Sequence, residues 1–218
     1  MKTFSSRHEY PMFEMRTRVN GNDSLLILFA TVTGNAERIA HRLAHEIQGC
    51  GFTARVMDMA RCAPQILTEH RTVLIVASTC GNGEPPDNAA SFWEAVVHGN
   101  GLDLRGLQFS VLALGNSTYD HFCRCGRELD AALERHGATR LYPRVDCDAD
   151  YDLPAKRWTQ SIIESLQCQK ITALRQELKE NGQNSEPQYE TAAGNTGPTS
   201  GYRNIFVGAR AMPGSSSN

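Results

Sequence analysis

The chain has 218 residues, of which 40% are hydrophobic, and it carries a formal net charge of -2 with a pI near 6.4. These values predict one globular domain with additional tails, because the chain is too short for two full catalytic domains. The near-neutral charge, without clusters of Lys and Arg, argues against a nucleic-acid surface, and no segment approaches the ~20 apolar residues of a membrane span.

Five short segments rich in Val, Ile, Leu or Phe are typical of buried β-strands. In chain order they are residues 24–30, 53–58, 72–77, 108–114 and, with the weakest pattern, 140–145. Most of these segments are nearly continuously apolar rather than alternating with polar residues. Such strands are expected where both faces of a parallel sheet are covered.

Helices are predicted between these strands, because apolar residues recur there every three or four positions. The first helix has its apolar stripe over residues 36–47, and further helices are indicated over 89–96 and 122–133. A last helix is expected after Pro154. Strands and helices that alternate in this way predict a doubly wound α/β fold with right-handed crossovers.

The expected domain covers residues 24–171. Residues 1–23 read as an irregular N-terminal segment, and residues 172–218, rich in Gly, Ser, Asn, Pro and charge, read as a linker or disordered tail. The seven cysteines are odd in number and lack CxxC spacing, so neither a disulfide framework nor a structural metal site is expected. With no apolar signal segment at the N-terminus, we expect a cytoplasmic protein.

Ligands of an open parallel sheet bind beyond the carboxyl ends of its strands, so the loops after the strands are the candidate site. The loop TVTGNAE, residues 31–37, has hydroxyls, a glycine and a helix start, which suit a phosphate. In STCGNGEPPDNAA, residues 78–90, the glycines let the backbone approach a planar ring. The loop LGNSTYDHFC, residues 114–123, brings Tyr119 to stack on that ring.

These loops resemble those of the flavodoxin family, specifically the FMN domain of the NADPH-dependent diflavin reductases. Within that group they are most similar to the flavoprotein subunits of bacterial assimilatory sulfite reductase. The segments TGNAERIA, STCGNGEPPDNA, LGNSTYDHFC and RVDCDADYDLPAKRW carry the resemblance, in order, over about residues 24–170. The resemblance implies a flavodoxin-like five-stranded parallel sheet of order 2-1-3-4-5 with helices on both faces, and FMN as the cofactor.

Three groups of cofactor contacts follow from the resemblance. The phosphate would be held by Thr31, Val32, Thr33, Gly34, Asn35 and Ala36. One face of the flavin would be covered by Ser78, Thr79, Cys80 and Gly81. The other face and the ring edge would be held by Leu114, Gly115, Asn116, Tyr119, His121, Phe122 and Cys123, with Asp148 added from the last strand's loop. No catalytic side chain and no metal ligand is predicted.

The implied function is FMN-dependent electron transfer within an NADPH-dependent oxidoreductase. Electrons would come from an FAD/NADPH reductase domain or protein and pass singly to a haem or other redox protein, as in sulfite reductase. The chain departs from the family at Cys80, where many diflavin reductases have an aromatic residue, and in lacking FAD and NADPH domains. Acidic residues near the loops favour a basic partner, and neither nucleic acid nor membrane is expected as a partner.

Two alternatives stay open, a flavodoxin-like NAD(P)H:quinone reductase and a flavin-less interaction module with the same fold. Residues 31–37 could also form only a helix cap closed by Glu37, and Tyr119 could be an ordinary loop aromatic. A receiver domain is disfavoured because the first strand ends in Thr31 and Thr33 rather than in acidic residues. A P-loop is disfavoured because Asn35 stands where a lysine is required.

Overall fold

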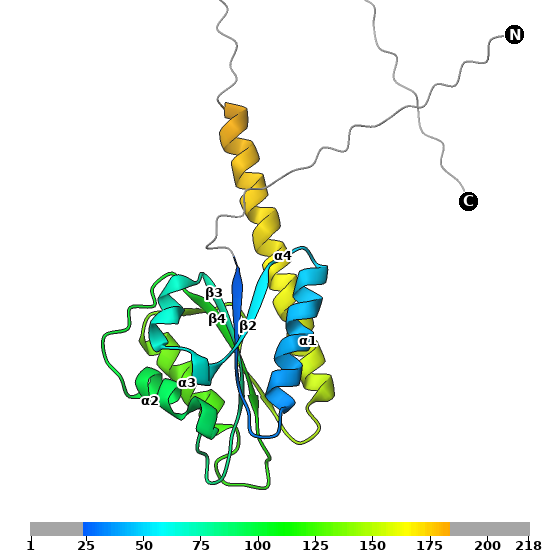
Figure 1. Ribbon diagram of the computed structural model, residues 1–218. Helices are drawn as coiled ribbons and strands as arrows, with labels where there is room; N and C mark the ends of the chain where they lie inside the picture. The colour runs from blue at the N-terminus through cyan, green and yellow to red at the C-terminus, as the bar shows by residue number, and fades with distance from the viewer. Residues whose placement is uncertain (1–23, 184–218) are drawn as a thin grey trace, which may run out of the picture. The chain divides into compact units, whose positions relative to one another are not determined.

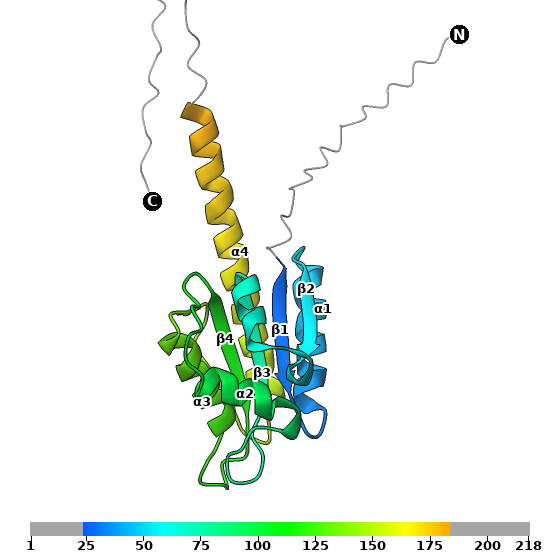
Figure 2. The same ribbon diagram turned by 60° about the vertical axis from the view of Figure 1, so that its left-hand side comes forward.

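The computed structural model describes residues 24–183 (Figure 1). The predicted N-terminal segment 1–23 and residues 184–218 of the predicted tail lie outside the described residues. A compact unit extends to Gln176 and contains a parallel sheet with helices on both faces (Figures 1 and 2).

The first four strands are β1 (Leu25–Ala30), β2 (Ala54–Asp58), β3 (Thr72–Ser78) and β4 (Gln108–Leu114). All pair in parallel, and the sheet order is β2-β1-β3-β4-β5. This confirms the predicted order. β2 is added on one side of β1 and β3 on the other, so the strand order changes direction between β1 and β3. The loops that follow these two strands therefore diverge and leave a crevice at the carboxyl edge of the sheet.

The fifth strand position is divided into two short strands, which corrects the predicted strand over residues 140–145. β5 (Thr139–Arg140) pairs with the start of β4, and β6 (Val145–Cys147) pairs with Leu112–Leu114 at its end. Between them stands Pro143, which has no N–H to donate to a strand ladder. The chain therefore leaves the sheet and returns one short strand later.

Four helices pack on the sheet, α1 (Asn35–Gly49), α2 (Ala90–Val97), α3 (Arg124–Arg135) and α4 (Asp152–Gln183). Short 3₁₀ helices are η1 (Met59–Arg61), η2 (Pro64–Glu69) and η3 (Asp87–Ala89). Residues 172–183, which the composition places in a linker, are helical as the end of α4. No helix among residues 24–183 combines the length and apolar character needed to cross a membrane.

The hydrophobic core has two parts, one on each face of the sheet. Leu28, Ile75 and Phe109 point toward α2 and α3, whereas alternate strand residues point toward α1 and α4 on the other face. On that second face Trp158 of α4 is buried, and its Nε1 donates to the buried Ser110 Oγ of β4 at 2.8 Å. This hydrogen bond fixes α4 against the centre of the sheet and so positions the loop that precedes it.

Candidate functional site

The loops after β1, β3, β4 and β6 meet at the carboxyl edge of the sheet, at the bottom of Figure 1, around a hollow of about 610 Å³. The hollow is lined by Val32, Thr33, Asn35, Ser78, Thr79, Cys80, Gly81, Leu114, Gly115, Asn116, Tyr119, His121, Phe122, Cys123, Ala149 and Tyr151. Most of the predicted contact residues therefore gather at one place. The predicted residues outside this lining are Thr31, Gly34, Ala36 and Asp148, and the residues that the sequence missed are Ala149 and Tyr151.

The loop after β1 leaves the start of α1 open to a ligand. Thr31 Oγ1 accepts a hydrogen bond from the Gly34 N–H at 3.0 Å, and Gly34 adopts a left-handed conformation with φ 82°. Among the described residues no side chain caps α1, so the alternative of a simple cap closed by Glu37 is wrong. The N–H groups of the first helical turn have no acceptor within the helix and are free to donate to an anion.

Asn88 of η3 holds the loop after β1 in place. Its Oδ1 accepts from the Thr31 N–H at 3.4 Å, and its Nδ2 donates to Asp58 Oδ1 at 2.8 Å. The side chain thus connects the loop to η3 and to the end of β2. Thr31 is bonded into this framework and Ala36 of α1 is buried in the core. Their contact with a phosphate stays a prediction.

The loop after β3 forms a tight turn beside the hollow. Backbone hydrogen bonds join Cys80 and Glu84 in both directions at 2.9 Å, and the Thr79 N–H donates to the Leu114 carbonyl at 2.9 Å. Thr79 is one of the residues that line the hollow, and its Oγ1 atom is buried and has no hydrogen-bond partner among the described residues. A ligand with a polar edge would satisfy this hydroxyl, since buried polar groups are normally paired.

Cys80 lines the hollow as a protonated thiol. Burial raises the pKa of Cys80 first, and the nearby carboxylates of Asp87 and Glu84 raise it further. A neutral small side chain at this place occupies little of the hollow. Many diflavin reductases have an aromatic residue at this position. Here the protonated Cys80 side chain forms part of one wall of the site and is not a reactive thiol.

The loops after β3 and β4 touch each other at Gly83. A Cβ at this position would lie 2.7 Å from His121 Cβ and 2.8 Å from Arg124 Cδ, and Gly83 has φ 102°. Both the space and the backbone conformation require glycine. This contact sets the distance between the two walls of the hollow.

The loop after β4 forms the second wall and is held by the loop after β6. The Ser117 N–H donates to Asp148 Oδ1 at 3.0 Å, the Ser117 hydroxyl donates to the other carboxylate oxygen, and the Gly115 N–H donates to the Cys147 carbonyl at 2.9 Å. The hydrogen bonds from Ser117 lower the pKa of Asp148. Asp148 thus positions the wall, and its direct contact with a cofactor stays a prediction. Tyr119 projects from this wall with 62% of its surface exposed.

Cys123 closes the base of this loop. It is buried, has φ 57°, and its Sγ donates to the Ala113 carbonyl at 3.3 Å and to the Cys147 carbonyl at 3.5 Å. Burial raises the pKa of Cys123 to about 12, that of Cys125 to about 12 and that of Cys147 to about 11. All three thiols therefore stay protonated and do not act as nucleophiles.

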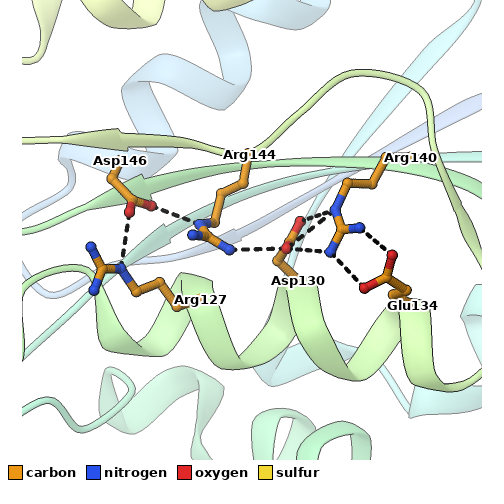
Figure 3. Close-up of polar contacts among 6 residues, drawn as sticks. All are labelled: Arg127, Asp130, Glu134, Arg140, Arg144 and Asp146. Carbon is orange, nitrogen blue, oxygen red and sulfur yellow. Dashed lines mark hydrogen bonds and ion pairs between the residues drawn. The ribbon is translucent and has the colours of Figure 1, made fainter.

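Behind this wall a chain of ion pairs joins α3 to the segment between β5 and β6 (Figure 3). Asp130, whose side chain is 3% exposed, accepts from Arg140 at 2.7 Å and from Arg144 at 2.9 Å. Arg144 also donates to Asp146 at 2.8 Å, and Arg127 donates to the same carboxylate at 2.9 Å. The series of ion pairs ends at the protein surface with the pair between Arg140 and Glu134.

This arrangement places Asp146, Cys147 and Asp148 in a fixed backbone position next to the hollow. Asp146 is held by two arginines, and Cys147 and Asp148 bond to the loop after β4. Asp146 and Asp148 are acidic residues near the loops, and the carboxylates of both are engaged in contacts within the domain.

The sheet order and a hollow between loops at its carboxyl edge define a flavodoxin-type α/β protein, a class that binds FMN at this switch point. The Flavodoxin family model matches residues 27–158, and the chain belongs to this family. Membership of this family confirms the predictions of a flavodoxin-like fold, of FMN as cofactor and of a role in electron transfer.

Several curated relatives are named sulfite reductase [NADPH] flavoprotein alpha-component, and two of them show the range of similarity. That of Bacillus subtilis (strain 168) is 44% identical over 140 residues, covering 64% of this chain and 23% of the relative. That of Neisseria meningitidis is 33% identical over 180 residues, covering 82% of this chain and 28% of the relative. The chain thus spans about a quarter of the length of these relatives.

Solved flavodoxin structures are similar over nearly their whole length. A flavodoxin of Streptococcus pneumonia TIGR4 is 26% identical with a TM-score of 0.60, and 67% of this chain covers 99% of that one. A single-residue mutant of the flavodoxin from Pseudomonas aeruginosa is 25% identical with a TM-score of 0.58, covering 66% of this chain and 99% of that one. The described domain therefore corresponds to a complete flavodoxin.

Proposed function

We propose that FMN occupies the hollow and that this chain is the FMN-carrying domain of an electron-transfer system of the sulfite reductase flavoprotein type. The observation that carries the proposal is that an uncapped helix start and Thr79, whose buried hydroxyl has no partner among the described residues, belong to loops that meet at one hollow. These features offer N–H donors for a phosphate and a hydroxyl for a polar ring edge. The residues present fit an FMN molecule.

In this assignment each loop has one task. The N–H groups at the start of α1, with Thr33 and Asn35, hold the phosphate. The Cys80 turn and Tyr119, from the two loops that line the hollow, would enclose the flavin ring. When bound, FMN supplies one- and two-electron transfer, and the protein contributes binding, orientation and partial shielding from water.

Electrons would reach the flavin from an FAD/NADPH reductase domain or protein and leave to a haem or other redox protein. The relatives named as sulfite reductase flavoprotein components support this pairing. The exposed acidic residues on the loops near the hollow, Glu84, Asp87, Asp120, Asp150 and Asp152, would form an acidic rim. A rim of one charge steers basic partners toward the site and weakens as ionic strength rises.

Anaerobic mixing of FMN-loaded protein with NADPH tests the carrier role. The visible flavin band should persist with NADPH alone and bleach when a diflavin-type reductase domain is added, because in this proposal electrons reach the flavin only through the reductase. FMN-loaded protein without NADPH serves as the control. Rapid bleaching by NADPH alone would overturn the carrier role and favour a quinone reductase.

A further inference from the structure

We propose that Tyr151, oriented by Arg38, donates a hydrogen bond to the phosphate of the bound flavin nucleotide and thereby favours FMN over riboflavin. The inference rests on the proposed function. Tyr151 lies between β6 and α4 and lines the hollow, and it is not among the contact residues predicted from the sequence.

The hydrogen bond between the two side chains has only one possible direction. Arg38 Nη2 lies 2.6 Å from the Tyr151 hydroxyl oxygen. A guanidinium group is always a donor, so the phenol oxygen must accept. The phenol hydrogen then points away from Arg38, and within residues 24–183 no protein acceptor receives it. Tyr151 is therefore a donor whose acceptor must come from water or from a ligand.

The position of this donor is fixed on the side of the phosphate loop. Arg38 stands in the first turn of α1, since its N–H donates to the Gly34 carbonyl at 3.0 Å. One turn further, Arg42 lies 4.0 Å from Asp152, the first residue of α4. Two arginines of α1 thus contact two consecutive residues at the start of α4. The Tyr151 hydroxyl is held next to the helix start that offers N–H groups to the phosphate.

The charge of Arg38 strengthens this donor. A phenol that accepts from a cation is polarised and donates more strongly through its own hydrogen. The positive charge of Arg38 would thus strengthen the hydrogen bond from Tyr151 to the phosphate, without a direct ion pair between Arg38 and the phosphate. Riboflavin lacks the phosphate but has the same ring and ribityl chain. The hydroxyl of Tyr151 should therefore matter for FMN alone.

Titration of apoprotein with FMN and with riboflavin, followed by flavin fluorescence, tests the inference. Tyr151→Phe removes one oxygen atom and should lower FMN affinity about tenfold, the effect of losing a hydrogen bond to a charged group. Riboflavin affinity should stay within about twofold of the wild type. The matched control is Tyr142→Phe, because Tyr142 packs on the same core but lies outside the lining of the hollow.

A second pair of variants separates the arginines. Arg38→Gln should weaken FMN about threefold by removing the charge behind the phenol, and Arg42→Gln, one turn away, should leave both affinities unchanged. An equal loss for FMN and riboflavin in Tyr151→Phe, or no loss for either, would overturn this inference while the proposed function stands. Wild-type apoprotein that fails to bind FMN would overturn both.

Discussion

Replacing Asp130 by Asn should destabilise the domain by about 3 kcal/mol. Asp130 is almost completely buried and its carboxylate neutralises two guanidinium groups, those of Arg140 and Arg144 (Figure 3). Asparagine keeps the shape of the side chain but removes the negative charge. Both arginines would then face a neutral amide group where α3 packs against the segment from β5 to β6.

The magnitude follows from the burial of the three side chains. Removing one partner of a buried pair costs roughly 3–5 kcal/mol, because the other charge stays unpaired. Here the side chains of Arg140 and Arg144 are 30% and 28% exposed, and each keeps a second carboxylate partner, Glu134 or Asp146. We therefore take the lower end of this range. For a domain of this size it corresponds to a fall in Tm of roughly 6–12 °C.

Urea unfolding of the apoprotein, followed by far-UV circular dichroism, measures the free energy of unfolding directly. Glu134→Gln is the matched control, because Glu134 bonds to the same Arg140 but its side chain is 60% exposed. This control should cost much less than Asp130→Asn. A free energy of unfolding of Asp130→Asn within about 1 kcal/mol of the wild type would refute the view that this network stabilises the fold.

Four further predictions concern the hollow and its walls. Tyr119→Ala should weaken FMN binding about fivefold, or ~1 kcal/mol, by removing a stacking surface, as measured by fluorescence titration. Thr79→Val should weaken FMN binding without lowering the Tm of the apoprotein, since its hydroxyl has no protein partner among the described residues. Iodoacetamide at pH 8 should modify exposed Cys168 but not Cys123, whose pKa burial raises to about 12, as read by mass spectrometry. Ser117 lowers the pKa of Asp148, so FMN retention on ultrafiltration should be complete above about pH 4 and fall as the pH drops through that lowered pKa.

Each of these has an outcome that would contradict it. Unchanged FMN affinity in Tyr119→Ala would place this ring away from the flavin. A lower Tm of Thr79→Val apoprotein would mean that the hydroxyl already has a partner within the fold. Modification of Cys123 in folded protein would contradict its burial. Asp148→Asn provides the control for the acid effect, and a wild-type loss of FMN that persists unchanged in this variant would exclude Asp148 as its cause.

The first four strands could be predicted to within one residue at each end, because β1, β3 and β4 are mostly apolar and buried on both faces and the edge strand β2 is still rich in apolar residues. The fifth position could not. Its two short strands are separated by Pro143, and Arg140 and Arg144 in this segment turn toward Asp130 on α3. The partners that hold this segment lie on another element, so a local hydrophobic pattern does not reveal them.

The candidate site was predictable where its residues follow strand ends, because a parallel sheet brings these loops to one edge. The roles of Tyr151 and Asn88 depend instead on partners far along the chain. Tyr151 bonds to Arg38 across 113 positions, and Asn88 bonds to Thr31 across 57. Neither residue type at these positions indicates its partner, and only the folded structure brings them together.

The end of α4 shows a different limit of the sequence. Residues 172–183 are polar in composition, yet the helix continues through them to Gln183. Many of these residues are good helix formers, such as Leu174, Glu177 and Lys179, and local propensity is sufficient to extend a helix already fixed by Trp158. A composition typical of linkers therefore does not exclude a regular helix.

The identity and stoichiometry of the bound cofactor test the central claim most directly. Apoprotein should be saturated with FMN or with FAD, freed of unbound flavin, and the cofactor released by heat should then be identified by chromatography against standards. We predict about one FMN per chain, together with a shifted visible absorption band, and no retained FAD. Retention of FAD in place of FMN, or no retention of FMN at all, would contradict the assignment of this hollow as an FMN site.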